Sequence, residues 1–244
     1  MTQTEDDVAE LTLHHMGRTG FQPALVVIGA MDGVSFDGLH PYIVTYEWSG
    51  LFVEPMPAQF RRLWRNYVAL PFARANKYEN SAIANHDGTV RMLTIDQRAV
   101  DEGLVHPAFG GMSAIYPPRN GLASEGDAAT VQQYGQVVDV NCITLDTLFT
   151  RHAVERVDVL WIDAEGWDYE IVGQLDFSRF RPKLLRAGYI NLSAGEKLAL
   201  TELLARNGYV VRIHGQNIDA VAVEYWNEIA AARPKTSVHA APAS

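Results

Sequence analysis

The sequence predicts an α/β fold built on a mostly parallel sheet, with helices between the strands. Segments Leu25–Ile28 and Val157–Ile162 are almost continuously apolar, as strands buried on both faces of a parallel sheet are. Each runs into a glycine-containing turn that is followed by a helical pattern. Near the C-terminal end, segments 209–213 and 218–225 flank a tight turn around Gly215 and predict an antiparallel hairpin.

The first strand ends in the turn Gly29–Gly33. Glycine allows a tight turn and a close approach of the backbone to a ligand, which a Cβ would obstruct. Ligands of α/β sheets bind beyond the carboxyl ends of the strands, so this turn is a candidate ligand loop. An ordinary strand-to-helix turn is the alternative. A helix over Ser35–Tyr46, interrupted near Gly38 and Pro41, is expected next.

The second strand, Leu51–Glu54, ends on a carboxylate 25 positions after Gly29. In nucleoside-binding α/β folds, an acid at this point accepts hydrogen bonds from the ribose hydroxyls. The alternative is a charge that stabilises the N-terminus of the following helix. That helix is expected over Ala58–Tyr67, with a buried apolar stripe made of Phe60, Leu63, Trp64 and Tyr67.

Residues 80–136 divide into a strand region and an irregular region. Asn80–Asn85 and Val90–Ile95 predict two strands that form a hairpin around His86–Thr89. Residues 96–136 lose periodicity and predict a long loop, which is either a substrate lid or a surface insertion. His106 in this loop is a weak candidate for a catalytic base.

A second informative stretch follows a helix predicted over Thr144–His152. The apolar strand 157–162 ends at Asp163, and Glu165 follows two residues later, before Gly166 opens a helix. Such a cluster of acids can hold an ammonium, a sulfonium, a metal or the proton of a substrate hydroxyl. Asp168 is a third acid with no assigned role, and Glu170 is expected only to favour the helix N-terminus.

The two ends of the chain are expected to lie outside the main domain, which we place at residues 21–229. Residues 1–20 are a polar lead-in with a solvated His14–His15 pair, and residues 230–244 predict a disordered tail. Within the domain, a strand over Lys183–Ile190 precedes a helix that starts at a capping box, Ser193–Glu196.

Composition narrows the class of partner. The 244 residues carry a formal net charge of -9 and a pI near 5.3, which disfavours nucleic acid and anionic membrane surfaces. No apolar run is long enough to span a membrane, and the acidic start is unlike a secretory signal. The single cysteine, Cys142, is expected to be a small core residue and fits a cytoplasmic protein.

Five short motifs follow one another along the chain: Ile28–Gly33, Trp48–Pro55, Ser81–Ile83 with Asp87–Gly88, Ile143–Asp146 and Ile162–Gly166. In this order they resemble the motifs of the FkbM family, and the resemblance covers residues 24–225. The resemblance implies a Rossmann-like class I methyltransferase fold with a seven-stranded, mostly parallel sheet. It also implies S-adenosylmethionine (SAM)-dependent methylation of a hydroxyl on a sugar, glycan or polyketide-type natural product.

The resemblance also implies roles for individual residues. The SAM-binding set would be Gly29, Ala30, Asp32 and Gly33 at the methionine part, Glu54 with Pro55 at the ribose, and Ser81 with Ala82 at the adenine. Asp163 and Glu165 would lie at the methyl-transfer end and act in catalysis, with Asp163 also contacting the cofactor. A divalent metal on these two acids is a less favoured version. The partner would be a small-molecule or glycan acceptor, and a homo-oligomer is compatible with the sequence.

Two positions depart from the family pattern. Val27 replaces an acid that usually precedes the first Ile-Gly, and this loss is expected to be tolerated. Gly188 stands where similar sequences tend to carry a glutamate, so any role of that acid is absent here or is filled by Asp163 or Glu165. Two alternatives therefore stay open: an NAD-type oxidoreductase, although the Gly29-x-x-x-Gly33 turn differs from its G-x-G-x-x-G pattern, and an inactive SAM-binding protein.

Overall fold

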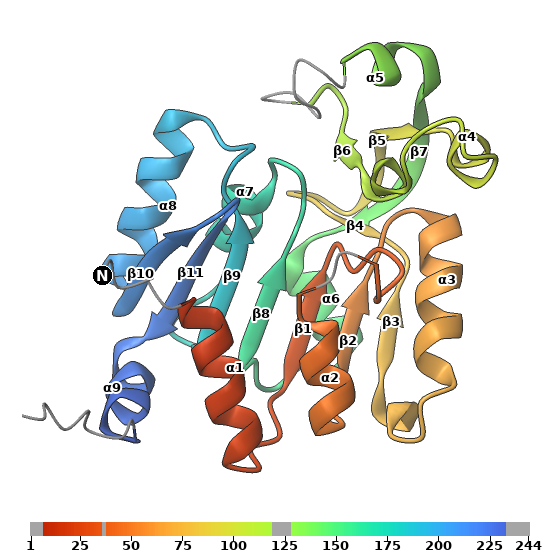
Figure 1. The fold of residues 1–244 in the computed structure, drawn as a ribbon. Coiled ribbons are helices and arrows are strands. Elements are labelled where there is room, and N and C mark those ends of the chain that lie inside the picture. The colour runs from red at the N-terminus through yellow and green to blue at the C-terminus, as the bar shows by residue number, and fades with distance from the viewer. Residues whose placement is uncertain (1–6, 36–37, 119–127, 233–244) are drawn as a thin grey trace, which may run out of the picture.

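A computed structural model describes residues 7–35, 38–118 and 128–232. Its centre is a seven-stranded sheet in the order β10-β11-β9-β8-β1-β2-β3 (Figure 1). The strands are β1 (Leu25–Ile28), β2 (Gly50–Val53), β3 (Lys77–Glu79), β8 (Val159–Ile162), β9 (Leu184–Gly188), β10 (Tyr209–His214) and β11 (Asn217–Ala222). The first five of these pair in parallel, whereas β11 is antiparallel to both β9 and β10. The predicted mostly parallel sheet with a terminal antiparallel hairpin is confirmed.

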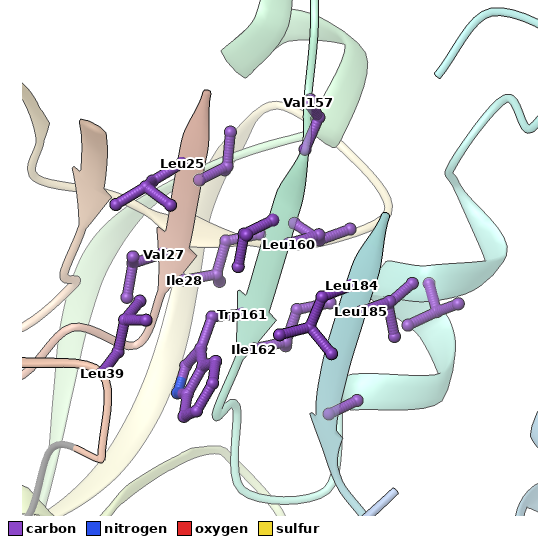
Figure 2. Close-up of a cluster of buried hydrophobic side chains, with 14 of the residues drawn as sticks. Leu25, Val27, Ile28, Leu39, Val157, Leu160, Trp161, Ile162, Leu184 and Leu185 are labelled. Atoms are coloured by element: carbon purple, nitrogen blue, oxygen red, sulfur yellow. The ribbon is translucent and has the colours of Figure 1, made fainter. Parts of the chain in front are cut away.

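The strands in the middle of the sheet form the hydrophobic core. Every residue of β1 and β8 is buried, which explains their unbroken apolar sequences (Figure 2). The register pairs Ile28 of β1 with Val53 of β2 and with Ile162 of β8. The residues that follow these strands therefore meet at one edge of the sheet, where a site can form.

Helices cover the sheet and supply the rest of the core. They are α1 (Val8–Arg18), α2 (His40–Tyr46), α3 (Pro57–Val68), α6 (Leu145–Arg151), α7 (Asp168–Gly173), α8 (Ala194–Arg206) and α9 (Val223–Ala232). Helix α1 contacts β9 and β11 as well as the neighbouring helices α2 and α9 (Figure 1). The capping box at Ser193 is present at the start of α8, as predicted.

A second sheet of four strands lies beside the carboxyl ends of the first (Figure 1). Its order is β4-β7-β5-β6, formed by β4 (Ala82–Ile83), β7 (Gly135–Ile143), β5 (Gly88–Ile95) and β6 (Ser113–Ile115). The predicted hairpin between 80–85 and 90–95 is wrong, because β7 lies between β4 and β5 and pairs with both. A long strand from a later part of the chain thus replaces the local pairing.

The irregular region expected over residues 96–136 is largely structured. It contains α4 (Gln97–Asp101), the 3-10 turn η2 (Pro107–Gly111), β6, α5 (Ala128–Tyr134) and the start of β7. The short length of these elements explains why no periodicity is visible in the sequence. Part of this segment, residues 119–127, lies outside the described residues.

Several local predictions need correction. Trp64 is 48% exposed, because α3 buries the row of Gln59, Leu63 and Tyr67 instead. His15 is buried on α1 beside Tyr225 rather than solvated. Helix α2 begins only at His40, so the expected helix from Ser35 is shorter.

At the C-terminal end, β11 stops at Ala222, and the residues up to Ala232 form α9. The predicted strand to residue 225 is therefore too long, and the predicted tail from 230 starts inside a helix. The rest of that tail, residues 233–244, lies outside the described residues. Cys142 is buried in the second sheet, as expected. In the described ranges, no helix combines the length and apolar character that crossing a bilayer requires.

Candidate active site

A cavity of about 320 Å³ opens where β1, β2 and β8 end. Most of the residues predicted from the sequence line it: Gly29, Ala30, Glu54, Pro55, Ser81, Ala82, Asp163 and Glu165. Asp32 and Gly33 are not among the lining residues. The strand-end turns that are far apart in sequence thus meet around one space.

The glycines of the β1 turn are required by packing against protein. Gly29 has φ +79°, and a Cβ there would overlap the backbone carbonyl oxygen of Asp163. Gly33 has φ +75°, and a Cβ there would overlap the ring of Tyr67. Gly29 therefore allows the β1 turn to lie directly against the end of β8, which brings the two turns of the site together.

The backbone amides of this turn are already used within the protein. Gly29 and Ala30 both donate to the carbonyl of Val53, at 2.9 and 3.0 Å. The carboxylate of Asp32 accepts from the backbone N–H groups of Val34 and Ser35 and from the Ser35 hydroxyl. Although burial raises the pKa of Asp32, these hydrogen bonds lower it below its usual value. Asp32 thus fixes the loop shape from outside the cavity.

Glu54 is 4% exposed and joins two loops at the cavity wall. One carboxylate oxygen accepts from the backbone N–H of Met31 at 2.9 Å, and the other accepts from Met56 at 2.8 Å. Burial raises its pKa to about 8, against these two hydrogen bonds, and the nearby Asp163 and Asp32 raise it further. A positively charged or hydroxyl-donating ligand would favour its ionised form.

We expect this buried acid to make stability depend on pH. The pKa of Glu54 is about 8 in the folded protein and near the model-peptide value of 4.5 in the unfolded chain. The folded state thus holds the extra proton between these values, so the free energy of unfolding falls as pH rises from about 5 to about 8. Glu54→Gln should reduce this fall by a few kcal/mol in urea titrations across that range. An unchanged pH slope in the variant would contradict the assignment.

Ser81 lies at the cavity wall with its hydroxyl oriented by a buried acid. Its Oγ donates to Glu79 at 2.7 Å, and Glu79 also pairs with Arg151 and His152. Burial raises the pKa of Glu79, but the hydrogen bonds from Ser81, His152 and Arg151 outweigh it and lower the value. Because its proton is directed to Glu79, Ser81 presents an oxygen that accepts hydrogen bonds toward the cavity.

The acidic turn after β8 carries the other two predicted acids of the cavity. The Asp163 side chain is exposed only to the cavity, and protein surrounds it on its other sides. The resulting loss of solvation raises its pKa. Burial raises the pKa of Glu165 to about 8, and the neighbouring Asp163 and Asp168 add to the effect. Glu165 has φ +46°, a left-handed conformation that non-glycine residues adopt rarely and that is common at functional sites.

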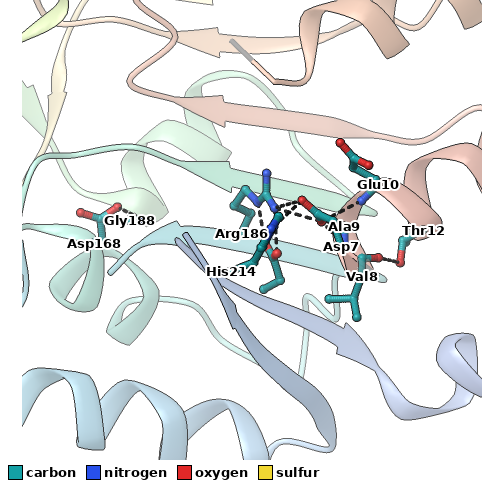
Figure 3. Close-up of polar contacts among 10 residues, drawn as sticks. Asp7, Val8, Ala9, Glu10, Thr12, Asp168, Arg186, Gly188 and His214 are labelled. Atoms are coloured by element: carbon teal, nitrogen blue, oxygen red, sulfur yellow. Dashed lines mark hydrogen bonds and ion pairs between the residues drawn. The ribbon is translucent and has the colours of Figure 1, made fainter. Parts of the chain in front are cut away.

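Asp168, to which the sequence analysis assigns no role, is a further functional candidate. It is 1% exposed, and its carboxylate accepts from the backbone N–H groups of Ala164, Gly166 and Gly188. Figure 3 shows it facing Gly188. Burial raises its pKa to about 7, with a contribution from Asp163 and opposed by these hydrogen bonds. Its place two residues after Gly166 on the N-terminal turn of α7 is the sequence signal.

This contact clarifies the departure at Gly188. A Cβ at Gly188 would lie 3.0 Å from a carboxylate oxygen of Asp168. The space beside Gly188 therefore already holds a carboxylate, which comes from α7 instead of β9. Asp168, rather than Asp163 or Glu165, is the acid that lies against this position.

Metal ligation at Asp163 and Glu165 gains no support from the geometry. Within the described ranges, the group of three potential ligands that lie within 4.8 Å is Asp7, His214 and Asp219, far from these acids in sequence. Arg186 already pairs with both aspartates of that group (Figure 3). The guanidinium supplies the positive charge there, so the cluster ties α1 to the sheet.

The segment after β5 forms part of the cavity wall. Its lining residues are mostly small or apolar: Ala108, Gly111, Met112, Ser113 and Ile115. Gln59 of α3 donates to the carbonyl of Gly110 and holds this segment in place. His106 is exposed and accepts from the backbone N–H of Ala108, so it starts the turn η2 and does not line the cavity.

The described ionisable residues that line the cavity are all acidic. Three acids line it, Glu54, Asp163 and Glu165, and Asp168 lies directly behind. Among the described residues, no lysine, arginine or histidine lines it. The cavity can therefore accept hydrogen bonds, stabilise a cation and remove a proton, whereas it disfavours an anionic group.

Three solved structures are similar to the chain. Methyltransferase FkbM from Methylobacillus flagellatus KT is 14% identical, with a TM-score of 0.49, over 82% of this chain and 43% of that one. Precorrin-6y C5,15-methyltransferase from Geobacter metallireducens GS-15 is 12% identical, with a TM-score of 0.42, over 90% and 89%. Magnesium protoporphyrin IX methyltransferase from Synechocystis PCC 6803, with bound SAM, is 9% identical, with a TM-score of 0.42, over 88% and 78%.

The sequence comparisons give the family. A search of curated proteins finds no match. The model of the methyltransferase FkbM domain matches residues 28–211, which span the β1 turn, Glu54, the acidic turn and the first half of β10. The seven-stranded, mostly parallel sheet with its terminal antiparallel hairpin agrees with the fold that the family resemblance implied. The chain therefore belongs to the FkbM methyltransferase family.

Proposed function

We propose that the protein is a SAM-dependent O-methyltransferase that acts on a hydroxyl of a sugar, glycan or polyketide-type natural product. The observation that carries this proposal is the acidic cavity, in which three carboxylates and no positive side chain of the described residues meet. SAM carries a sulfonium, an ammonium and two ribose hydroxyls, which complement such a lining. Its carboxylate would have to find hydrogen-bond donors elsewhere, since the amides of Gly29 and Ala30 are occupied.

The residues present fit SAM at its two ends. Glu54 would accept hydrogen bonds from the ribose hydroxyls, because a carboxylate can accept two at once. Ser81 and Ala82 would border the adenine, and the Ser81 oxygen would accept from the exocyclic amino group, since its own proton is directed to Glu79. Gly29 and Ala30 would make van der Waals contact with the methionine part. Asp32 and Gly33 would act indirectly, because they fix the conformation of the turn.

Bound SAM would supply an electrophilic methyl group, and the protein would align the acceptor and remove its proton. Glu165 or Asp163 would accept the hydroxyl proton, since both line the cavity. The pKa of Glu165, about 8, makes its carboxylate a stronger base than an ordinary glutamate. The wall formed by residues 108–115 would cover the acceptor, which is the role expected for a substrate lid in residues 96–136. Its mostly apolar lining suits the carbon skeleton of a natural product.

Label transfer from SAM tests this proposal. The protein is incubated with methyl-labelled SAM and a panel of glycosides, glycans and polyketides, and the products are analysed for label on oxygen. We expect transfer to a hydroxyl of at least one neutral acceptor and none to an acceptor whose hydroxyl is converted to a methyl ether. Transfer to nitrogen or carbon only would contradict the proposal.

A further inference from the structure

We propose that Asn191 is a positioning residue, which holds one oxygen of Glu165 so that the other oxygen faces the acceptor as the base. The role of Glu165 as a base rests on the proposed function, whereas the contact between the two side chains does not. Asn191 lies in the segment between β9 and α8, outside the motifs from which the site was predicted.

The contact is direct and specific to one oxygen. The Asn191 Nδ2 donates to Glu165 Oε2 at 2.5 Å, and both residues are half-buried. With Oε2 taken, Oε1 is the oxygen left for the acceptor hydroxyl. An amide N–H so close to a carboxylate also favours its ionised form, against the burial and the neighbouring acids that raise the pKa of Glu165.

The segment that carries Asn191 is fixed before any ligand binds. The backbone N–H groups of Tyr189 and Ile190 donate to the carbonyl of Gln216 at 2.8 and 3.1 Å. Lys197 donates to the carbonyl of Ile190 at 3.2 Å. These bonds tie the segment to the β10–β11 turn and to α8, so the donor needs no reorganisation during the reaction.

The acidic turn is held from its other side by Asp168. Asp168 accepts from the N–H groups of Ala164 and Gly166, the two residues that flank Glu165. The backbone of Glu165 is thus held in its left-handed conformation by Asp168, and its side chain is held by Asn191. Two separate contacts therefore define where the base lies, and only the second acts on the carboxylate itself.

In this arrangement the proton of the acceptor hydroxyl moves to Glu165 as the methyl group is transferred. The acceptor O–H bond breaks, an Oε1–H bond forms on Glu165, and the oxygen electron pair forms the new bond to the methyl group. The electrons of the broken S–C bond would leave with the sulfur of the methyl donor, so the step would balance. Glu165 is then neutral, and its Oε2 still accepts from Asn191, so the contact persists through the step.

The test compares Asn191→Asp with Asn191→Ala. Aspartate has nearly the same shape as asparagine but lacks the donor, so a role in packing alone would survive that change. The readout is a ¹³C NMR titration of the Glu165 carboxyl in the protein without ligand, assigned by its absence in Glu165→Gln. We expect the pKa of Glu165 to rise by roughly one pH unit or more in Asn191→Ala, and further in Asn191→Asp.

Asn141→Asp, on the exposed face of β7, adds the same charge elsewhere and should leave the titration unchanged. In methyl-transfer assays, the pH at which kcat reaches half its maximum should move with the NMR value, while the KM for SAM stays constant. A wild-type titration of Glu165 in Asn191→Asp would overturn the proposal. If no acceptor is methylated at all, the proposed function fails, but the NMR titration still decides whether Asn191 controls Glu165.

Discussion

Glu165→Gln and Asp163→Asn should lower the rate of methyl transfer by roughly 10²- to 10⁴-fold, the usual contribution of a general base. Each amide keeps the shape of its acid and removes its capacity to accept a proton. Both acids line the cavity, and the amide of Asn191 orients Glu165. The measurement is single-turnover methyl transfer with saturating SAM, which separates the chemical step from product release.

A matched control removes a charge of the same type away from the site. Glu202→Gln, on the exposed face of α8, should retain the wild-type rate. Binding of SAM should persist in Glu165→Gln, because Glu54 and Ser81 are intact. Near-wild-type rates in both Glu165→Gln and Asp163→Asn would show that positioning alone drives the reaction and that neither acid is the base.

Gly29→Ala should be strongly destabilising, by at least ~3 kcal/mol in the free energy of unfolding. The positive φ alone costs roughly 1–2 kcal/mol for a residue with a Cβ. The larger part comes from the overlap of that Cβ with the carbonyl of Asp163, which would force the β1 turn away from β8. Urea unfolding measures the total effect, and any variant that folds should also have lost affinity for SAM.

Gly103→Ala provides the control, because Gly103 has a similar φ of +71° and no atom within 4 Å of the added Cβ. Its loss of stability therefore measures the free-energy cost of the left-handed backbone conformation alone, without any overlap of the added Cβ with other atoms. We expect Gly103→Ala to lower stability by ~1 kcal/mol. Equal losses in the two variants would mean that the contact between the β1 turn and Asp163 does not organise the site.

The parallel core was predictable because a strand that is buried on both faces needs apolar residues at every position. The residues of β1 and β8 are all buried, and their apolar runs show it. The pairing of the second sheet could not be predicted in this way, because it depends on β7, which follows β5 by about 40 residues. Strand β7 takes the place of the expected local hairpin partner. Similarly, the N-terminal segment gives no strong signal, yet α1 covers β11 and buries His15.

The site was predictable where residues follow strands directly. Glu54, Asp163 and Glu165 lie at strand ends, and the carboxyl ends of parallel strands meet at one edge of the sheet. The contacts of Asp168 with Gly188 and of Asn191 with Glu165 join segments that are distant in the chain, and no spacing rule predicts them. Trp64 illustrates the converse, since Leu63 and Tyr67 of the predicted helical stripe are buried, whereas Trp64 is exposed and Gln59, which was not predicted, is buried.

Calorimetric titration of the protein with SAM and, separately, with NAD tests the central claim that the acidic cavity is a SAM site. We predict saturable binding of one SAM per chain, weaker in Glu54→Gln, and no heat of binding for NAD under the same conditions. NAD carries two phosphates, for which the cavity lining offers no positive side chain among the described residues. Binding of NAD without binding of SAM, or SAM affinity unchanged by the loss of the Glu54 carboxyl group, would contradict the account.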